Sequence, residues 1–344
     1  MSPTGDFAGD CPLCGSSELD ERRRVSNLQG EDVEIVRCAG CALVRRNVGP
    51  DRDRYHADEN PVTYSEAWAR AKAADLSLPG HESVWRDRVY FALREFLDAS
   101  PEKRPRVLEV GCGIGHNLAA FRRYGCDVTG VEPSSAAARF GRERFGLRII
   151  EEYVDDADLG AGQFDLVILD SVLEHLPDPV GTLASLRSLI APGGRLYVDV
   201  PNLRAWYGKL LGRSWNIYEP GHINFFTPET AAKAVEAAGF KVVKATTHDG
   251  LVTWGLTFTV ALNQAIKKVT ARAGGRAGWR QAGVDEQAEA LQQTSGLEKP
   301  VLRHRVENSL WLALGIALTP LRRIQFRRGG GMGVWILAEV SDRS

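Results

Sequence analysis

Short apolar runs that alternate with helical stretches constrain the fold of this chain more than any other feature. The apolar runs predicted as strands are Arg106–Val110, Val128–Glu132, Leu147–Ile150, Phe164–Leu169, Arg195–Val200, Phe240–Thr246 and Val334–Val340. Helical patterns lie between most of them, at 116–124, 134–145, 180–190 and 228–238. Strands that alternate with helices form parallel sheets with covered faces. The pattern therefore predicts a doubly wound α/β sheet.

The composition is typical of a soluble globular protein. Of the 344 residues, 44% are hydrophobic and 25% are charged, and 43 lysines and arginines balance 44 aspartates and glutamates. A formal net charge of −1 argues against a surface dedicated to nucleic acid. The sequence has no evident secretory signal and no apolar run near the roughly 20 residues of a membrane span. We therefore expect a soluble, cytosolic protein.

Four of the six cysteines form two close pairs, Cys11 with Cys14 and Cys38 with Cys41. In a reducing cytosol, one tetrahedral zinc ion explains such pairs better than disulfides do, although a redox pair and chance spacing are alternatives. Four cysteine ligands would close the coordination sphere, so this zinc would be structural. The segment around Val33–Val36 is expected to form a hairpin that carries the second pair.

Small residues beside the cysteine pairs bear on this zinc-ribbon prediction. Gly15 and Gly40 would permit the tight turns that a ribbon needs, whereas Ala42 stands where zinc ribbons often have glycine. The two remaining cysteines, Cys112 and Cys126, are expected to be buried thiols of the core.

A glycine-rich turn follows the first predicted strand, in residues 107–115, VLEVGCGIG. Such a turn between a strand and a helix lets backbone N–H groups approach a nucleotide-like ligand. A dinucleotide fingerprint would continue with glycine at position 116, but this chain has His116. The second strand ends in Glu132, and a carboxylate at that place can accept hydrogen bonds from both ribose hydroxyls.

These segments resemble the class I S-adenosylmethionine-dependent methyltransferases. The resemblance covers roughly residues 82–250 and returns at 334–340, carried by VLEVGCGIG, GVEPS, FDLVILDSVLEHLPDP and LIAPGGRLYVDVPN. It implies a Rossmann-like seven-stranded sheet and S-adenosylmethionine as cofactor. The residues implied to bind the cofactor are Glu109, Gly111, Gly113, Gly115, Glu132, Tyr153, Val154 and Asp170. Among them, Glu132 would hold the ribose, residues 152–154 would lie near the adenine, and Asp170 would face the methionine part.

Two histidines are candidate catalytic residues. His175 belongs to the motif LEHLP, where the family's histidine is usually architectural, so both a cofactor-wall role and a catalytic role stay open. His222 follows an aromatic-rich stretch, and a reference pKa near 6.5 would suit it as a general base. Its alternative role is to tie a loop to the core. Some quinone-pathway relatives bind a divalent metal through an acidic residue where this chain has Ser171, so no catalytic metal is expected.

The expected domain organisation has five parts: a zinc ribbon at 1–48, a linker with leading helices at 49–100, the cofactor-binding core at 101–250, a helical insertion or cap at 251–330, and the final strand at 331–344. A ribbon joined to such a core resembles enzymes of bacterial cell-envelope glycan and secondary-metabolite pathways. The acceptor is therefore expected to be a small molecule or glycan, methylated on oxygen. The aromatic-rich residues 203–220 either bind that acceptor or form a helical hairpin packed on the core.

Two other functions fit parts of the sequence. Zinc-ribbon methyltransferases also modify ribosomal RNA, and the arginines of this ribbon favour that alternative: Arg22, Arg23, Arg24, Arg37, Arg45 and Arg46. The near-neutral charge of the whole chain opposes it, because a run of charges is usually a solvated face. A non-catalytic domain that binds the cofactor as a scaffold or sensor is the third possibility.

An apolar helix is predicted near the C-terminus, at residues 309–318. It is too short to span a bilayer and is flanked by arginines on both sides, including Arg303 before it and Arg322 after it. One interpretation is a lid packed over the substrate site. The other is peripheral contact of residues 301–328 with the inner face of an anionic membrane, with the arginines at the headgroups.

Overall fold

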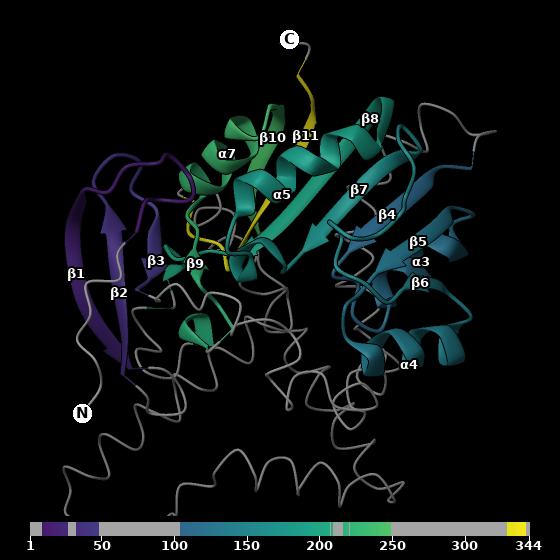
Figure 1. The fold of residues 1–344 in the computed structure, drawn as a ribbon, viewed down its shortest axis with the longest axis horizontal. Helices are drawn as coiled ribbons and strands as arrows, with labels where there is room; N and C mark the ends of the chain where they lie inside the picture. Colours follow the sequence, from purple (N-terminus) through teal and green to yellow (C-terminus); the bar gives the residue numbers. More distant parts are fainter. Residues whose placement is uncertain are drawn as a thin grey trace, which may run out of the picture.

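The computed structural model describes residues 9–26, 32–47, 104–206, 208, 216–219, 221–248 and 329–341. In this part of the chain the strands form two sheets, one of four strands and one of seven (Figure 1). The predicted leading helices at 49–100 and almost all of the predicted insertion at 251–330, with its apolar helix, lie outside the described residues.

The seven-stranded sheet has the order β10-β11-β8-β7-β4-β5-β6. Its strands are β4 (Arg106–Val110), β5 (Asp127–Val131), β6 (Arg148–Ile150), β7 (Phe164–Asp170), β8 (Ile190–Pro201), β10 (Phe240–His248) and β11 (Gly333–Val340). Neighbours from β6 to β8 are parallel, whereas β11 runs antiparallel to both β8 and β10. The chain starts at β4, runs outward to β6 and then returns to β7, so the strand order reverses beside β4.

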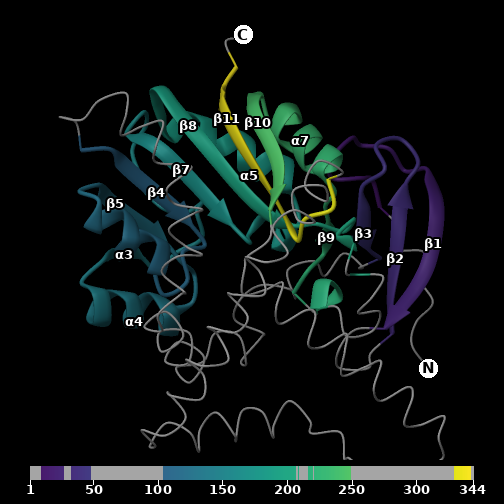
Figure 2. The same cartoon turned by 180° about the vertical axis from the view of Figure 1, so that it is seen from behind.

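Helices cover both faces of this sheet. They are α3 (His116–Arg123), α4 (Ser135–Phe145), α5 (Pro179–Leu186) and α7 (Pro228–Ala237). Residues of α5 and α7 share one apolar core with one face of the sheet, and residues of α3 and α4 share another core with the opposite face. Along β7, Val167 and Leu169 belong to the first core and Leu166 and Ile168 to the second. Accordingly α7 lies in front of β10 in Figure 1 and behind it in Figure 2.

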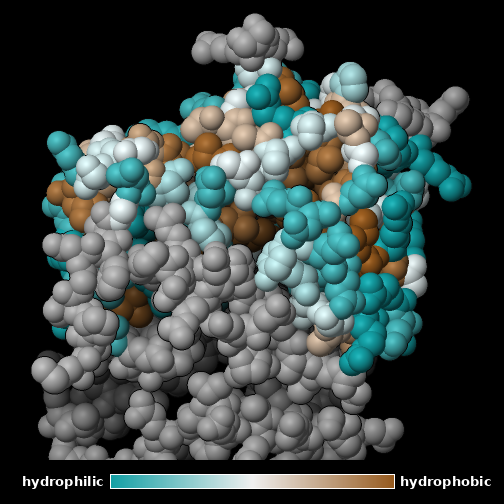
Figure 3. All heavy atoms as spheres, in the orientation of Figure 1, coloured by the Kyte–Doolittle hydropathy of each residue, from teal (hydrophilic) through white to brown (hydrophobic). Residues whose placement is uncertain are grey.

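The helix starts follow local sequence chemistry. Asp178 caps α5 by accepting a hydrogen bond from the Gly181 N–H, and Pro179 occupies the first turn, where a missing N–H costs nothing. Thr227 caps α7 in a reciprocal capping box with Thr230. On the face drawn in Figure 3, apolar and polar side chains alternate over the front helices, whereas the margin around α3 and α4 is mostly polar.

The four-stranded sheet has the order β1-β2-β3-β9. Its strands are β1 (Leu19–Ser26), β2 (Asp32–Cys38), β3 (Val44–Arg46) and β9 (Asn224–Phe225). The first three strands come from the N-terminal segment, and β9 lies just before α7. Every pairing is antiparallel. The N-terminal ribbon is therefore completed by a strand that lies about 180 residues later in the chain.

The structure confirms the predicted α/β sheet and its seven strands. The hairpin predicted around residues 33–36 is present as β1 and β2. One boundary was wrong: the helix expected at 180–190 ends at Leu186, a short 3-10 turn follows, and β8 already starts at Ile190. The antiparallel direction of β11 was not predicted, because hydrophobic patterning encodes which residues are buried and not which way a strand runs.

Candidate functional site

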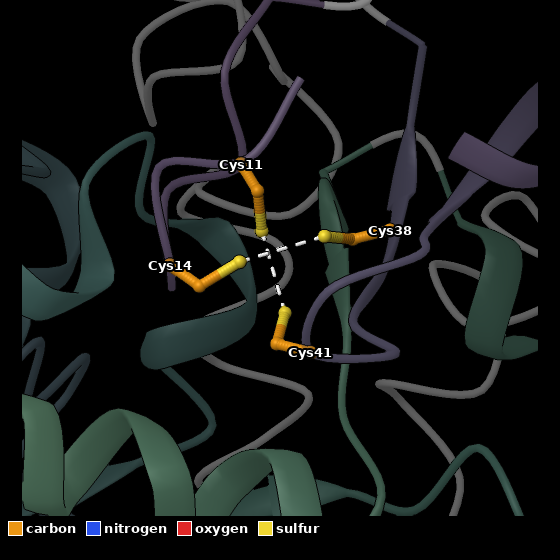
Figure 4. Close-up of side chains that lie close together, drawn as sticks. All are labelled: Cys11, Cys14, Cys38 and Cys41. Atoms are coloured by element: carbon orange, nitrogen blue, oxygen red, sulfur yellow. Dashed lines mark hydrogen bonds between the residues drawn. The ribbon is translucent and has the colours of Figure 1, made fainter. Parts of the chain in front are cut away.

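The four cysteines of the N-terminal segment converge on one point (Figure 4). The sulfur atoms of Cys11 and Cys41 are 3.5 Å apart, and so are those of Cys14 and Cys38. A disulfide would require about 2.05 Å, whereas a tetrahedral zinc with bonds of about 2.3 Å places its sulfurs about 3.8 Å apart. The geometry therefore fits one zinc ion, and all six cysteines of the chain are free of disulfides.

The charge balance of the thiols also fits a cation. Burial raises the pKa of Cys41 and of Cys11. Burial also acts on Cys38, but hydrogen bonds from the Cys41 backbone and the Cys14 thiol outweigh it and lower the pKa of Cys38 to about 7. A bound dication would supply the charge that keeps four adjacent thiolates ionised.

Two residues shape the turn at the second cysteine pair: Gly40, between the two cysteines, and Ala42, directly after Cys41. Gly40 lies tightly against Cys14, whose sulfur would be 3.4 Å from an added Cβ. Ala42 has a φ of 69°, in the left-handed region that favours glycine. The glycine that zinc ribbons often have at this place thus has a backbone reason, and the alanine here is strained.

The glycine-rich turn forms the bottom of the second candidate site. Gly111, Gly113 and Gly115 all have positive φ values, between 54° and 76°. A Cβ on Gly111 would lie 2.6 Å from Val172, and one on Gly115 would lie 2.4 Å from Leu147. The turn therefore needs glycine both for its backbone conformation and for close packing beneath it.

Glu132 closes this turn from the end of β5. Its carboxylate accepts hydrogen bonds from the Gly113 N–H, at 2.7 Å, and from the Ser134 N–H, at 2.8 Å. Only 3% of Glu132 is exposed, so it is not a solvated acid at a strand end. Burial raises its pKa, and the two backbone donors partly offset that effect. Each carboxylate oxygen has two lone pairs, which leaves capacity for further donors.

Glu109 and Asp170 end up on either side of Asn117, in the first turn of α3. The Asn117 amide nitrogen donates to the Glu109 carboxylate at 2.6 Å and to the Asp170 carboxylate at 3.1 Å. Burial, assisted by the nearby Asp170 and Glu132 carboxylates, raises the pKa of Glu109 well above its usual value. The second oxygen of Glu109 is buried and has no hydrogen-bond partner in the described part of the chain.

The two candidate histidines are brought together beside the carboxyl end of β7. Their rings contact edge to face, with centroids 4.8 Å apart. His175 comes from a 3-10 turn, η3 (Leu173–His175), and its Nδ1 lies 2.8 Å from the Gly221 carbonyl oxygen. His222 directs Nδ1 to the Ile217 carbonyl oxygen at 2.8 Å and Nε2 to the Glu219 carboxylate at 3.0 Å. In both rings Nδ1 therefore donates its proton to the backbone.

The Glu174 carboxyl group lies near the Nε2 atoms of both rings. Its carboxyl oxygen is 3.8 Å from Nε2 of His222 and 3.9 Å from Nε2 of His175. Both of its oxygens are buried without a hydrogen-bond partner among the described residues. Burial, only partly offset by His222, raises the pKa of Glu174 to about 8.

The two histidines have opposite pKa shifts. Burial, reinforced by the neighbouring His222, lowers the pKa of His175 to about 4. Burial alone would also lower the pKa of His222, but the hydrogen bond that its ring donates to Glu219 and the nearby Glu174 carboxylate outweigh burial and raise the pKa. His175 is thus a neutral ring near pH 7, and His222 is the ring that can change its protonation state.

Comparisons with known proteins agree with this geometry. A family model described as a methyltransferase domain matches residues 84–245. The ubiquinone biosynthesis O-methyltransferase of Coxiella burnetii is 30% identical over 156 residues, which cover 42% of this chain and 67% of the relative. The chain belongs to the class I S-adenosylmethionine-dependent methyltransferases.

More distant similarities accompany this family match. The ubiquinone biosynthesis O-methyltransferase of Aromatoleum aromaticum is 28% identical over 152 residues, which cover 40% of this chain and 65% of the relative. The match to that relative thus spans less than two thirds of its length. Among solved structures, a SAM-dependent methyltransferase from Archaeoglobus fulgidus is 20% identical, with a TM-score of 0.43 over 74% of this chain and 93% of the other.

Several features of the turn fit S-adenosylmethionine. Glu132 keeps free lone pairs, and Glu109 has one buried oxygen that no described residue satisfies. Tyr153 is 37% exposed, and Val154 packs against the main core, both in the stretch after β6. The assignment of each residue to one part of the cofactor stays a prediction.

The cluster beside β7 also has the donor set of a metal site. Ligand atoms of Glu174, His175 and His222 all lie within 4.8 Å of one another. The prediction that no catalytic metal binds was based on Ser171. The three residues grouped here are different ones: Glu174 and His175 lie just after Ser171, and His222 comes from a distant segment.

Five of the six ribbon arginines are ion-paired or buried in the described part of the chain. Arg22, Arg23 and Arg37 form ion pairs with acidic residues of the β1–β2 hairpin: Glu34, Glu21 and Asp20, respectively. Arg45 and Arg46 are 3% and 8% exposed. This arrangement gives the RNA alternative no additional support.

Some polar residues at the carboxyl edge of the sheet were missed by the sequence analysis. Asn117, which bridges two carboxylates, carried no signal beyond its position in the first turn of α3. Asp199 on β8 bonds to Nε2 of His248 at 2.8 Å and receives the Tyr197 hydroxyl at 3.2 Å. His248 lies 49 residues from Asp199 in the sequence, so only the sheet register reveals that contact, whereas Tyr197 lies two residues away on the same strand.

Other predictions are decided in part. Cys112 and Cys126 are buried core thiols, as expected. In the aromatic-rich stretch 203–220, Trp206 and Tyr218 pack in an apolar cluster with ribbon residues, which favours the packing interpretation for these two side chains. Within the described residues, no helix is both long and apolar enough to cross a bilayer.

Proposed function

We propose that this chain transfers the methyl group of S-adenosylmethionine to a hydroxyl oxygen of a small-molecule acceptor, with His222 as the general base. The observation that carries the proposal is the His222 pair with Glu219, at the carboxyl edge of the sheet where ligands of such folds bind. The curated relatives are named O-methyltransferases, which supports an oxygen acceptor.

The cofactor supplies an electrophilic methyl group, so the chain has to align the acceptor and remove its proton. The glycine turn, Glu109 and Glu132 bind and orient the donor, and Asp170 lies beside them through Asn117. The acceptor hydroxyl gives its proton to Nε2 of His222, because Nδ1 is held by the Ile217 carbonyl; Nε2 faces Glu219 at 3.0 Å, so the hydroxyl takes the place of the carboxylate at this nitrogen. Glu219 then stabilises the imidazolium that forms.

The raised pKa of His222 fixes the direction of the pH dependence. The free base is present only above that pKa, so turnover should rise with pH through a midpoint above 6.5. Glu219→Gln removes the nearest carboxylate and should move the midpoint to lower pH by about 1 unit. An unchanged midpoint in that variant would exclude the His222–Glu219 pair as the titrating group.

The direct test is His222→Asn, assayed with methyl-labelled cofactor. Loss of a general base lowers kcat by about 10²- to 10⁴-fold, while cofactor affinity measured by calorimetry should stay within about twofold. His175→Asn is the comparison variant, because the same cluster holds that ring and it is the next candidate base. Near-normal turnover in His222→Asn combined with a large loss in His175→Asn would assign the proton transfer to His175.

The class of acceptor is a separate part of the proposal. A zinc ribbon joined to this core favours a saccharide or secondary-metabolite hydroxyl, whereas the names of the relatives favour a quinone precursor. A phenolic hydroxyl has a pKa near 10, which demands less of a histidine base than a sugar hydroxyl does. Mass spectrometry of both acceptor classes after incubation with labelled cofactor would separate them. Salt-sensitive retention and methylation of RNA would instead support the RNA alternative.

A further inference from the structure

A buried arginine of the zinc ribbon, Arg46, contacts the loop that carries His222. Arg46 lies at the end of β3 and is 8% exposed. Its backbone N–H donates to the Ile223 carbonyl at 2.8 Å. Its guanidinium Nη2 donates to the Glu219 carbonyl at 3.0 Å and to the Tyr218 carbonyl at 3.3 Å. We name residues 216–219 and 221–223 the His222 loop, so Arg46 binds this loop both before and after His222.

The other side of the His222 loop is fixed to the sheet. The Ile223 N–H donates to the Glu174 carbonyl at 2.9 Å, and the Gly221 carbonyl accepts from His175 at 2.8 Å. The loop is therefore held between the ribbon and η3, with His222 in the middle. Because the backbone positions of Glu219 and His222 set the 3.0 Å contact between their side chains, a shift of either end would disturb that pair.

The ribbon itself is packed firmly enough to act as a support. Val44 pairs with Phe225 across the β3–β9 ladder, and both share an apolar cluster with Ile217 and Tyr218 of the His222 loop. Lys233 of α7 donates to the Cys41 carbonyl at 3.3 Å, beside the zinc cluster. The strand that carries Arg46 is thus anchored at both of its ends.

We infer that Arg46 is a positioning residue for methyl transfer, which sets the backbone of the His222 loop from within the zinc ribbon. The inference rests on the proposed role of His222 and adds a residue far from the cofactor motifs. Without the guanidinium, the Tyr218 and Glu219 carbonyls lose this donor, the Glu219 carbonyl keeps only the His222 N–H at 3.1 Å among the described residues, and the loop can relax away from η3. A displacement of about 1 Å near reacting groups is enough to cost about 100-fold in rate.

Arg46→Met is the test, because methionine keeps much of the apolar stem and removes every donor of the side chain. Arg45→Met is the matched control: Arg45 lies in the same strand and is 3% exposed, and its guanidinium donates to the Gly9 carbonyl, whereas that of Arg46 donates to the two loop carbonyls. Both variants are measured as full-length, zinc-loaded protein. Arg46→Lys is the conservative variant, since lysine can still donate to one of the carbonyls.

Arg46→Met should lower kcat by about 10- to 100-fold and leave cofactor affinity within about twofold, whereas Arg45→Met should retain kcat at equal zinc content. Hydrogen exchange of the His222 loop should become about tenfold faster in Arg46→Met alone, with Arg46→Lys intermediate. Equal exchange and equal turnover in the two methionine variants would overturn the inference. Faster loop exchange with unchanged turnover would instead contradict the role of His222 in the proposed function, while the hold of Arg46 on the loop would stand.

Discussion

The proposed donor half and the proposed acceptor half of this site are built in different ways. The donor half, residues 107–134 with Asp170, comes mainly from one strand–turn–helix–strand segment. The acceptor half combines η3, the His222 loop and the ribbon strand β3, which lie far apart in the sequence. The donor half is stabilised by local turn chemistry, and the acceptor half by backbone hydrogen bonds between distant segments. Local disruption should therefore harm the donor half selectively, whereas loss of a remote support should harm the acceptor half.

The largest expected effect comes from removing the metal. Cys38→Ser takes away one of four ligands, and because structural zinc supplies folding free energy directly, the ribbon should unfold. Since β3 then no longer supports the His222 loop, turnover should fall by about 100-fold or more. Cofactor affinity should stay within about threefold, because no ribbon residue contacts the glycine turn among the contacts described.

Elemental analysis, calorimetry and a turnover assay on the same preparation would check this. The wild-type chain should hold about one equivalent of zinc. Cys126→Ser is the control, because Cys126 is buried in the core beside α3 and should leave both zinc and turnover in place. Full turnover by a metal-free chain would show that the ribbon does not support the acceptor half.

A change in the donor half should lower cofactor affinity and leave the zinc ribbon intact, the reverse of what zinc loss does. Glu132→Ala removes the charged acceptor predicted for the ribose hydroxyls and leaves the Gly113 and Ser134 N–H groups without their partner. Hydrogen bonds to charged groups contribute about 1.5–3 kcal/mol, so cofactor affinity should fall by about 10- to 100-fold. Zinc content and exchange of the His222 loop should not change.

Glu151→Ala is a suitable control for that variant. Glu151 follows the neighbouring strand and pairs with Arg142 at 2.6 Å, but it is far more exposed than Glu132. Its removal should alter cofactor affinity by less than about twofold, since surface ion pairs contribute little. Equal losses in both variants would indicate a general charge effect and contradict the assignment of Glu132.

The same contrast explains what could be predicted from the sequence. The glycines, Glu109 and Glu132 were found because a strand followed by a tight turn leaves a continuous local pattern. His175 and His222 were identified singly, but their contact depends on the sheet topology. Arg46 appeared only as one charge in a basic segment, since nothing local distinguishes an arginine that caps remote carbonyls from one that faces water. Its partners lie 172 and 173 residues away.

The smallest predicted effect concerns a strained residue of the ribbon. Ala42→Gly should stabilise the zinc-bound ribbon by about 0.5 kcal/mol, because relief of the left-handed backbone outweighs the added freedom of the unfolded chain. The urea midpoint for zinc release, followed with a coloured chelator, would measure it. Ala39→Gly, in the same knuckle but not among the residues with positive φ, should be neutral or destabilising. A lower midpoint for Ala42→Gly would show that the strain is compensated elsewhere.

The pairing of β3 with β9 also sets an order of events during synthesis. At about 5–20 residues per second, the 173 residues between Arg46 and Glu219 take roughly 10–35 s to emerge from the ribosome. Throughout that interval the ribbon presents one strand edge without its eventual partner, and such edges invite association with other chains. We therefore expect the edge of β3 to stay open until β9 arrives, and a slow stretch of translation before residue 224 would prolong that exposure.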